Sequence, residues 1–222
     1  MVGGSKDSGE RAWAWIRAAA AMTTVVAVLA ELVHEIRHAG ADESAIAVTA
    51  DFLGRYTNVS VIAAGVVLCL ATWSALVRRR PLRSAPAWIG GSLTGVAANL
   101  LLVAVIYNAL LRNIEPSDAI WWVNEFMHVW LPAYLLVDAL AVRQPRGRGQ
   151  FMWATFPPGI AWCIYFLTRE SYPYWFVDPA IIPGGVPGVL GVCIAVLIGV
   201  SLVALALQGL NALLHRRSAA EA

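Results

Sequence analysis

The chain has 222 residues, of which 59% are hydrophobic and only 14% are charged. This composition excludes an ordinary soluble domain, in which about a quarter of the residues carry charge. The formal net charge of +2 gives no indication of a nucleic-acid partner, because such partners select strongly basic surfaces. We therefore expect an integral membrane protein whose partners are lipids, with no nucleic acid among them.

Apolar residues gather in six runs, each close to or above the roughly 20 residues that a helix needs to cross hydrocarbon. The predicted spans are 13–33, 57–77, 88–111, 120–142, 151–168 and 186–214. We expect an all-α, polytopic protein in which these six transmembrane helices form one bundle over residues 13–214. Residues 1–12 are polar and rich in glycine and serine, and we expect them to be disordered. Residues 215–222 are expected to form a cytoplasmic tail.

Basic residues are distributed unequally between the two sides that six spans would define. One side holds twelve of them, namely Lys6, Arg11, Arg17, Arg78, Arg79, Arg80, Arg83, Arg143, Arg146, Arg148, Arg216 and Arg217. The other side holds four, namely Arg37, Arg55, Arg112 and Arg169. Short loops rich in arginine and lysine stay in the cytoplasm. The asymmetry therefore predicts a multi-pass protein of the cell membrane with both termini cytoplasmic.

Residues 34–38 spell H-E-x-x-H, a pattern that binds zinc on some helices. No third ligand follows at a recognised spacing, and a polar cluster is expected at the outer end of a span in any case. A histidine of this pair could instead share a haem with His128, although the sequence does not place them on facing helices. Cys69, Cys163 and Cys193 have neither disulfide nor metal-ligand spacing. We therefore expect no metal and no other cofactor.

The fourth span, 120–142, carries Asn124, Glu125, His128 and Asp138 in an otherwise apolar run. A charge at the centre of a membrane helix costs roughly 2.5–3.5 kcal/mol on insertion scales, so such groups usually serve the bundle interior or a site. Asn124 and Glu125 lie four and three residues before His128, on neighbouring faces of one helix. His128 is then either a histidine satisfied within the bundle or a general base.

A general base needs a hydroxyl within reach. Thr57 and Ser60 on the second span, and Tyr172 or Tyr174 in the outer loop, are predicted on the same side as His128. A threonine in a membrane helix often bonds only to its own backbone. The residues alone permit a hydrolase near the outer leaflet without requiring one.

Four short motifs occur in order along residues 50–180, namely RYTNVS at 55–60, YNALLR at 107–112, FMHVWLP at 126–132 and YPYWFVD at 172–178. They resemble motifs of a family of bacterial six-helix membrane proteins. That family is distantly related to the animal androgen-induced and androgen-dependent TFPI-regulating proteins. The animal proteins are threonine-dependent hydrolases of fatty acid esters of hydroxy fatty acids.

The resemblance implies that Thr57 is the nucleophile and His128 its base, and that the substrate is a fatty acid ester or a similar membrane lipid. An acyl-threonine would form and then be hydrolysed. The oxyanion of each step needs hydrogen-bond donors, for which Asn58, Asn124 and Tyr174 are candidates.

Glu125 or Asp138 could orient the imidazole in this mechanism. One position departs from the family, because relatives often have asparagine where this chain has Val61, so that Asn58 would have to take over its role. An alternative function is a non-catalytic lipid-binding or transport bundle. In that case Glu125, His128 and Asp138 would line a polar path along the fourth span.

Overall fold

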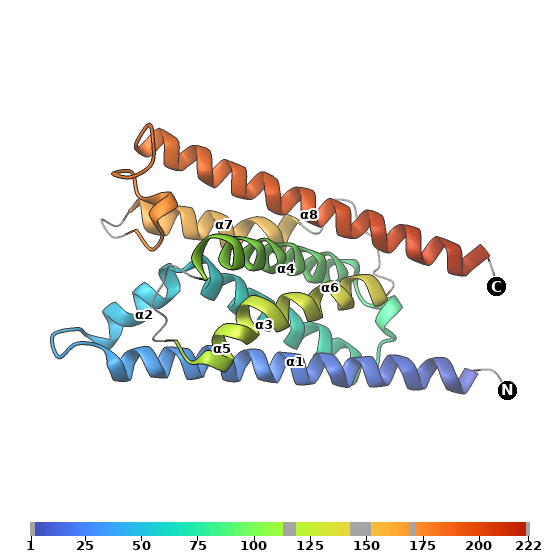
Figure 1. Ribbon diagram of the computed structural model, residues 1–222. Helices are drawn as coiled ribbons and strands as arrows, with labels where there is room; N and C mark the ends of the chain where they lie inside the picture. The colour runs from blue at the N-terminus through green and yellow to red at the C-terminus, as the bar shows by residue number, and fades with distance from the viewer. Residues whose placement is uncertain (1–2, 113–118, 143–151, 169–171, 221–222) are drawn as a thin grey trace.

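The computed structural model describes residues 3–112, 119–142, 152–168 and 172–220, and this part of the chain contains helices and no strand. The helices lie side by side in one elongated bundle (Figure 1), so the prediction of an all-α fold is confirmed. Among the predicted loop residues, Arg143, Arg146, Arg148 and Arg169 lie outside the described residues.

The long helices are α1 (Gly3–His38), α3 (Tyr56–Leu76), α4 (Ala87–Ile106) and α8 (Val186–Ala220). The shorter ones are α2 (Ala45–Gly54), α5 (Trp121–Glu125), α6 (Leu131–Ala141) and α7 (Met152–Leu167). Two π turns, η2 (Tyr107–Leu111) and η3 (Phe126–Trp130), extend α4 and join α5 to α6, and two 3-10 turns are η1 (Leu82–Ser84) and η4 (Trp175–Val177).

Every predicted span contains helix, and four stretches are long and apolar enough to cross a membrane. Within the described residues these are Ser8–His38, Tyr56–Leu76, Ala87–Leu111 and Val186–His215. The chain is thus built as a multi-pass membrane protein. The fourth predicted span is divided between α5, η3 and α6, and α7 has only 16 residues, so the count of six spans stays a prediction.

Both ends of the chain are more helical than expected. Residues 3–12, for which we expected disorder, belong to the first turns of α1 in the structure. There the Glu10 carboxylate accepts a hydrogen bond from the Leu82 backbone N–H at 2.9 Å, which ties the start of α1 to the segment after α3. At the other terminus, α8 continues to Ala220, so most of the predicted tail is helical too.

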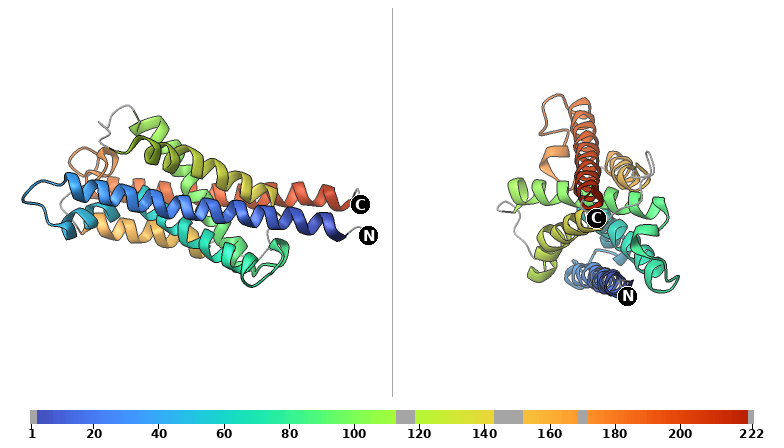
Figure 2. Two further views of the ribbon diagram at one scale, coloured as in Figure 1. Left: turned by 90° about the horizontal axis from the view of Figure 1, so that it is seen from below. Right: turned by 90° about the vertical axis from the view of Figure 1, so that its right-hand side faces the viewer.

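The core is built around α4, which packs against α3, α6, α7 and α8. Every residue from 89 to 100 is buried, and small residues such as Gly91, Gly95 and Ala98 let neighbouring helices approach closely. The outermost helices, α1 and α8, lie on opposite sides of the bundle (Figure 2). They expose apolar side chains such as Met22 and Leu202, as a lipid-facing surface requires.

Different elements lie at the two ends of the bundle. Both termini lie at one end (Figure 1). There the Asn211 amide donates to the backbone carbonyls of Ala139 and Val142, at 2.8 Å each, and joins α8 to the end of α6. The opposite end carries α2, the start of α3 and η4 (Figure 1).

Candidate functional site

The site begins at the break between α2 and α3. At Arg55 the backbone is extended, with φ −87° and ψ 127°, and α3 starts afresh at Tyr56. Gly54 permits this close turn, because a Cβ there would lie 2.5 Å from a ring carbon of Tyr165. The break places Thr57 in the first turn of a helix. In that turn the N–H groups have no partner within the helix, and the helix dipole is positive.

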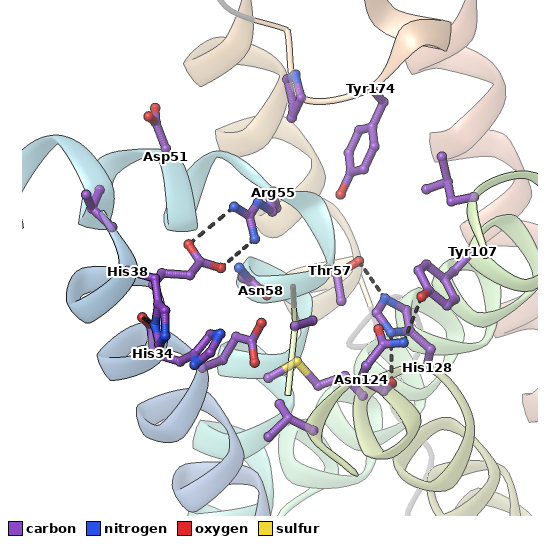
Figure 3. A pocket seen from close by; sticks show the side chains of 18 of the residues that line it. His34, His38, Asp51, Arg55, Thr57, Asn58, Tyr107, Asn124, His128 and Tyr174 are labelled. Atoms are coloured by element: carbon purple, nitrogen blue, oxygen red, sulfur yellow. Dashed lines mark hydrogen bonds and ion pairs between the residues drawn. The ribbon is translucent and has the colours of Figure 1, made fainter. Parts of the chain in front are cut away.

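Thr57 meets His128 across 71 residues of sequence, with 3.4 Å between Oγ1 and Nε2. The other ring nitrogen, Nδ1, lies 2.9 Å from the backbone carbonyl oxygen of Asn124. Because a carbonyl only accepts, Nδ1 carries the hydrogen and Nε2 presents its lone pair to the threonine hydroxyl. Figure 3 shows this arrangement, which is the one that a general base requires.

Tyr107 holds the imidazole from the side. Its ring stacks on His128 with 3.6 Å between centroids and 19° between planes. Its hydroxyl accepts a hydrogen bond from the Asn124 amide at 2.8 Å (Figure 3). Tyr107 was not among the predicted site residues. Its place at the start of the YNALLR motif was the signal that could have found it.

The orientation of His128 also depends on the π turn η3. There the Leu131 N–H bonds to the Phe126 carbonyl, five residues back. Pro132 follows and has no N–H, so the carbonyl of His128 loses the donor that an α-helix would supply. Asn108 of η2 replaces that donor, with its side-chain amide 3.2 Å from the His128 carbonyl oxygen. Two facing π turns therefore shape the site, a feature often found at functional positions.

Glu125 does not orient the imidazole, and that prediction is wrong. Its carboxylate forms an ion pair with Arg112, at the end of η2. Both side chains are partly exposed. The imidazole is held instead by the backbone carbonyl of Asn124, which a residue-by-residue reading of polar side chains does not detect.

The same prediction is wrong for Asp138. Asp138 lies ten residues after His128, about 15 Å further along a helix. It forms a buried ion pair with Arg17, 2.8 Å from Nε to Oδ1. It also accepts a hydrogen bond from the Trp13 indole N–H. Arg17, counted above with the basic residues of one side, is therefore a buried structural charge.

The remaining predicted donors have partners of their own. The buried Asn58 amide donates to the Phe52 carbonyl at 2.9 Å and closes the end of α2. The Asn124 amide is directed at the Tyr107 hydroxyl. Tyr174 belongs to the site differently, because it hangs from the loop before η4 with its hydroxyl directed into the pocket (Figure 3).

Two cavities meet at Thr57. The larger, called the vestibule here, has a volume of about 600 Å³ and a mixed polar lining that includes Glu31, His34, Arg55 and His128. The smaller, called the apolar cavity, has a volume of about 30 Å³. Its lining is mostly apolar and comprises Tyr56, Thr57, Val103, Ile106, Tyr107, Leu111, Trp162, Tyr174, Phe176 and Val196. The nucleophile candidate thus stands between a polar and an apolar compartment.

The H-E-x-x-H motif lies in the vestibule wall without metal-binding geometry. Its glutamate, Glu35, forms an ion pair with Arg55 at 2.5 Å, and Nδ1 of His38 lies 2.8 Å from the His34 carbonyl oxygen. Within the described residues, no three His, Cys, Asp or Glu side chains are close enough to hold a metal ion. Both ring nitrogens of His128 have the partners described above, so neither is directed at a haem iron.

Comparison of the chain with family models, with curated proteins and with solved structures finds no match. The resemblance to the bacterial six-helix family therefore consists of the four motifs alone.

Proposed function

We propose that the protein is an intramembrane hydrolase of lipid esters in which Thr57 is the nucleophile and His128 the general base. The observation that carries the proposal is the 3.4 Å approach of the two side chains, in the tautomer that leaves Nε2 free to accept a proton. A histidine with a purely structural role would not need a hydroxyl group at a helix N-terminus beside it, or a cavity on each side of that hydroxyl. The two residues also occupy the matching positions of the family that the motifs resemble.

The reaction proceeds in two halves. Nε2 of His128 takes the Thr57 hydroxyl proton while Oγ1 attacks the ester carbonyl carbon, and a tetrahedral oxyanion forms. Collapse of this intermediate breaks the carbon–oxygen bond to the alcohol, which leaves with the proton from Nε2. A water molecule then attacks the acyl-threonine with His128 again as base. The carboxylic acid is released, and Thr57 recovers its proton.

The backbone at the start of α3 supplies the best-placed oxyanion donors. Thr57 lies in the first turn, where free N–H groups and the positive end of the helix dipole favour negative charge. The amides of Asn58 and Asn124 are directed elsewhere, at the Phe52 carbonyl and the Tyr107 hydroxyl. This assignment explains why the helix has to start one residue before the nucleophile.

The two cavities divide the substrate between them. The apolar cavity has room for little more than one water-sized group, so it holds the carbons next to the ester while the rest of the chain runs toward lipid. The vestibule takes the opposite side of the ester. The family resemblance implies substrates with a free carboxylate. The guanidinium of Arg55 is already paired with Glu35, so neutral lipid esters fit the vestibule better than such substrates.

We place the six helices in the cell membrane with both termini in the cytoplasm. Supporting this, the termini share one end of the bundle (Figure 1), and the segment 78–80, with three consecutive arginines, follows α3 toward that end. Thr57 and His128 lie toward the other end, which would then be the outer leaflet. Lipid esters can reach such a site sideways from the bilayer.

The alternative of a transport bundle finds less support. It requires a polar path linking His128 to Asp138 along one helix. Leu131 and Leu135 lie between them on α6, with exposed fractions of 0% and 1%. Asp138 is further closed off by its ion pair with Arg17. A path along this helix would therefore need a large rearrangement of the core.

Turnover of a fluorogenic long-chain ester and labelling by a fluorophosphonate probe test the proposal. Thr57→Ala and His128→Ala should each lower turnover by at least about a hundredfold, the usual contribution of such groups. Thr57→Ala should also abolish the covalent adduct. Thr23→Ala is the matched control, because Thr23 is exposed and bonds only to the Ala19 carbonyl. Unchanged turnover in either site variant would refute the proposal.

A further inference from the structure

A second large cavity lies at the end of the bundle that carries the termini. It has a volume of about 430 Å³ and is called the arginine groove here. Its walls come from the first turns of α1 and from the end of α3 with the segment that follows. The lining residues are Glu10, Arg11, Ala14, Trp15, Ala75, Leu76, Arg79, Arg80, Pro81 and Leu82. The groove lies far from Thr57, at the opposite end of α3.

The charge of the groove is unbalanced. Three arginines, Arg11, Arg79 and Arg80, face a single acid, Glu10. None of the three guanidinium groups makes a hydrogen bond or an ion pair with another residue of the described part of the chain. The Glu10 carboxylate is already engaged by the Leu82 backbone N–H at 2.9 Å. The groove therefore presents three cationic groups with unfilled donor capacity.

The backbone of this segment is held in a conformation that most residues avoid. Arg79 has φ +49° and is the one non-glycine residue with positive φ among the described residues. The next N–H, that of Arg80, bonds back to the Ser74 carbonyl at 3.2 Å. Non-glycine residues in this region cost energy and tend to occur where a site requires them. The strained turn keeps two consecutive arginines in the wall of one cavity.

The remaining wall is apolar. Ala14, Ala75 and Leu76 line the groove, together with Trp15, which is 65% exposed. The candidate span of α3 ends at Leu76, so the arginines follow directly where hydrocarbon gives way to lipid headgroups. A free phosphate ion would use only the arginines. A phospholipid would use both halves, with its phosphate on the guanidinium groups and its glycerol and upper acyl carbons on the apolar wall.

We propose that the arginine groove is a binding site for the phosphate headgroup of an anionic glycerophospholipid. Basic pockets between transmembrane helices bind such headgroups, and guanidinium pairs phosphate oxygens with charge-assisted hydrogen bonds. Arg78 provides an internal contrast, because its guanidinium lies 4.4 Å from the centre of the Trp73 ring and it is not part of the groove lining. The site is independent of the hydrolase proposed above.

The test is native mass spectrometry of the full-length protein, titrated in detergent with phosphatidylglycerol or with phosphatidylcholine of the same acyl chains. The first phosphatidylglycerol should bind at least about fivefold tighter than phosphatidylcholine. Arg79→Gln and Arg80→Gln should each weaken it about fivefold, the effect of one basic residue near a membrane surface. Arg78→Gln is the matched control and should leave the affinity unchanged.

Three results would overturn the proposal. These are equal affinity for the two lipids, equal losses in Arg78→Gln and Arg79→Gln, and displacement of the lipid by millimolar inorganic phosphate, which would indicate a general anion site. Glu10→Gln covers the case in which the arginine variants do not fold. Its amide oxygen can still accept the Leu82 N–H while one negative charge leaves the groove. The affinity for phosphatidylglycerol should therefore rise, and no change would contradict the proposal.

Discussion

Replacing Asp138 with asparagine removes one charge from an ion pair whose side chains are 2% and 1% exposed. The asparagine oxygen can still accept the Trp13 indole N–H, but the Arg17 guanidinium is left buried without a counter-charge. Breaking a buried pair in this way costs about 3–5 kcal/mol. Folded proteins are stable by about 5–15 kcal/mol in total, so the single variant should be severely destabilised.

Removing both partners should behave differently. Arg17→Leu combined with Asp138→Leu takes two charges out of an apolar layer, and each charge costs roughly 2.5–3.5 kcal/mol to insert. Replacing a buried pair by apolar side chains is often neutral or stabilising. The double variant should therefore be at least as stable as Arg17→Leu or Asp138→Leu alone. The coupling energy between the two positions in this double-mutant cycle should exceed about 3 kcal/mol.

The assay is unfolding in mixed micelles of increasing denaturing detergent, followed by circular dichroism, with ester turnover per folded molecule measured in parallel. Turnover should be unchanged in Asp138→Asn, because the imidazole of His128 is held by the Asn124 carbonyl and not by this carboxylate. A loss of turnover of about tenfold, or roughly 1.4 kcal/mol of barrier, without a change in unfolding would contradict this structural role of Asp138. That result would put Asp138 on the reaction path.

Four further substitutions, at three positions, test the side chains around His128. Tyr107→Phe keeps the stacked ring and should retain turnover, whereas Tyr107→Ala loses about 0.5–1.5 kcal/mol of ring contact and should lower kcat; equal losses in both would assign the effect to the hydroxyl. Glu125→Gln breaks a partly exposed pair with Arg112, so unfolding should shift by less than about 1 kcal/mol and probe labelling should not slow. Asn108→Ala leaves the buried carbonyl of His128 without its side-chain donor, at a cost of about 1–3 kcal/mol. Probe labelling should slow as the histidine shifts. Undiminished labelling in a fully stable variant would show that the Asn108 hydrogen bond does not position His128.

The helical architecture could be predicted because its signals are local. Apolar runs of spanning length mark the helices wherever they fold, and the strongest of them became α1, α3, α4 and α8. The first turns of α1 include a contact that the local sequence does not indicate. Glu10 meets Leu82 only after α3 has returned the chain to the same end.

The candidate site was predictable in its two principal residues and not in their support. His128 was singled out by its polar setting and Thr57 by the motifs, whereas Glu125 and Asp138 were assigned to the histidine because they share its helix. Arg112 and Arg17, distant in sequence, bind those acids instead. The group that orients the imidazole is a backbone carbonyl, which every residue has. Its role therefore cannot be predicted from the residue types.

The two π turns have a consequence for the register of the helices that carry them. A π turn closes its hydrogen bond one residue further along than an α turn does, so η3 adds one residue to the helix that runs from α5 into α6. One residue corresponds to about 100° of rotation. On one side of η3 the helix must turn Asp138 toward Arg17, and on the other it must turn Asn124 toward Tyr107. An uninterrupted α-helix would link these two orientations rigidly. The additional residue changes the rotation between the two halves of the helix, so that Asp138 and Asn124 can each face its own partner.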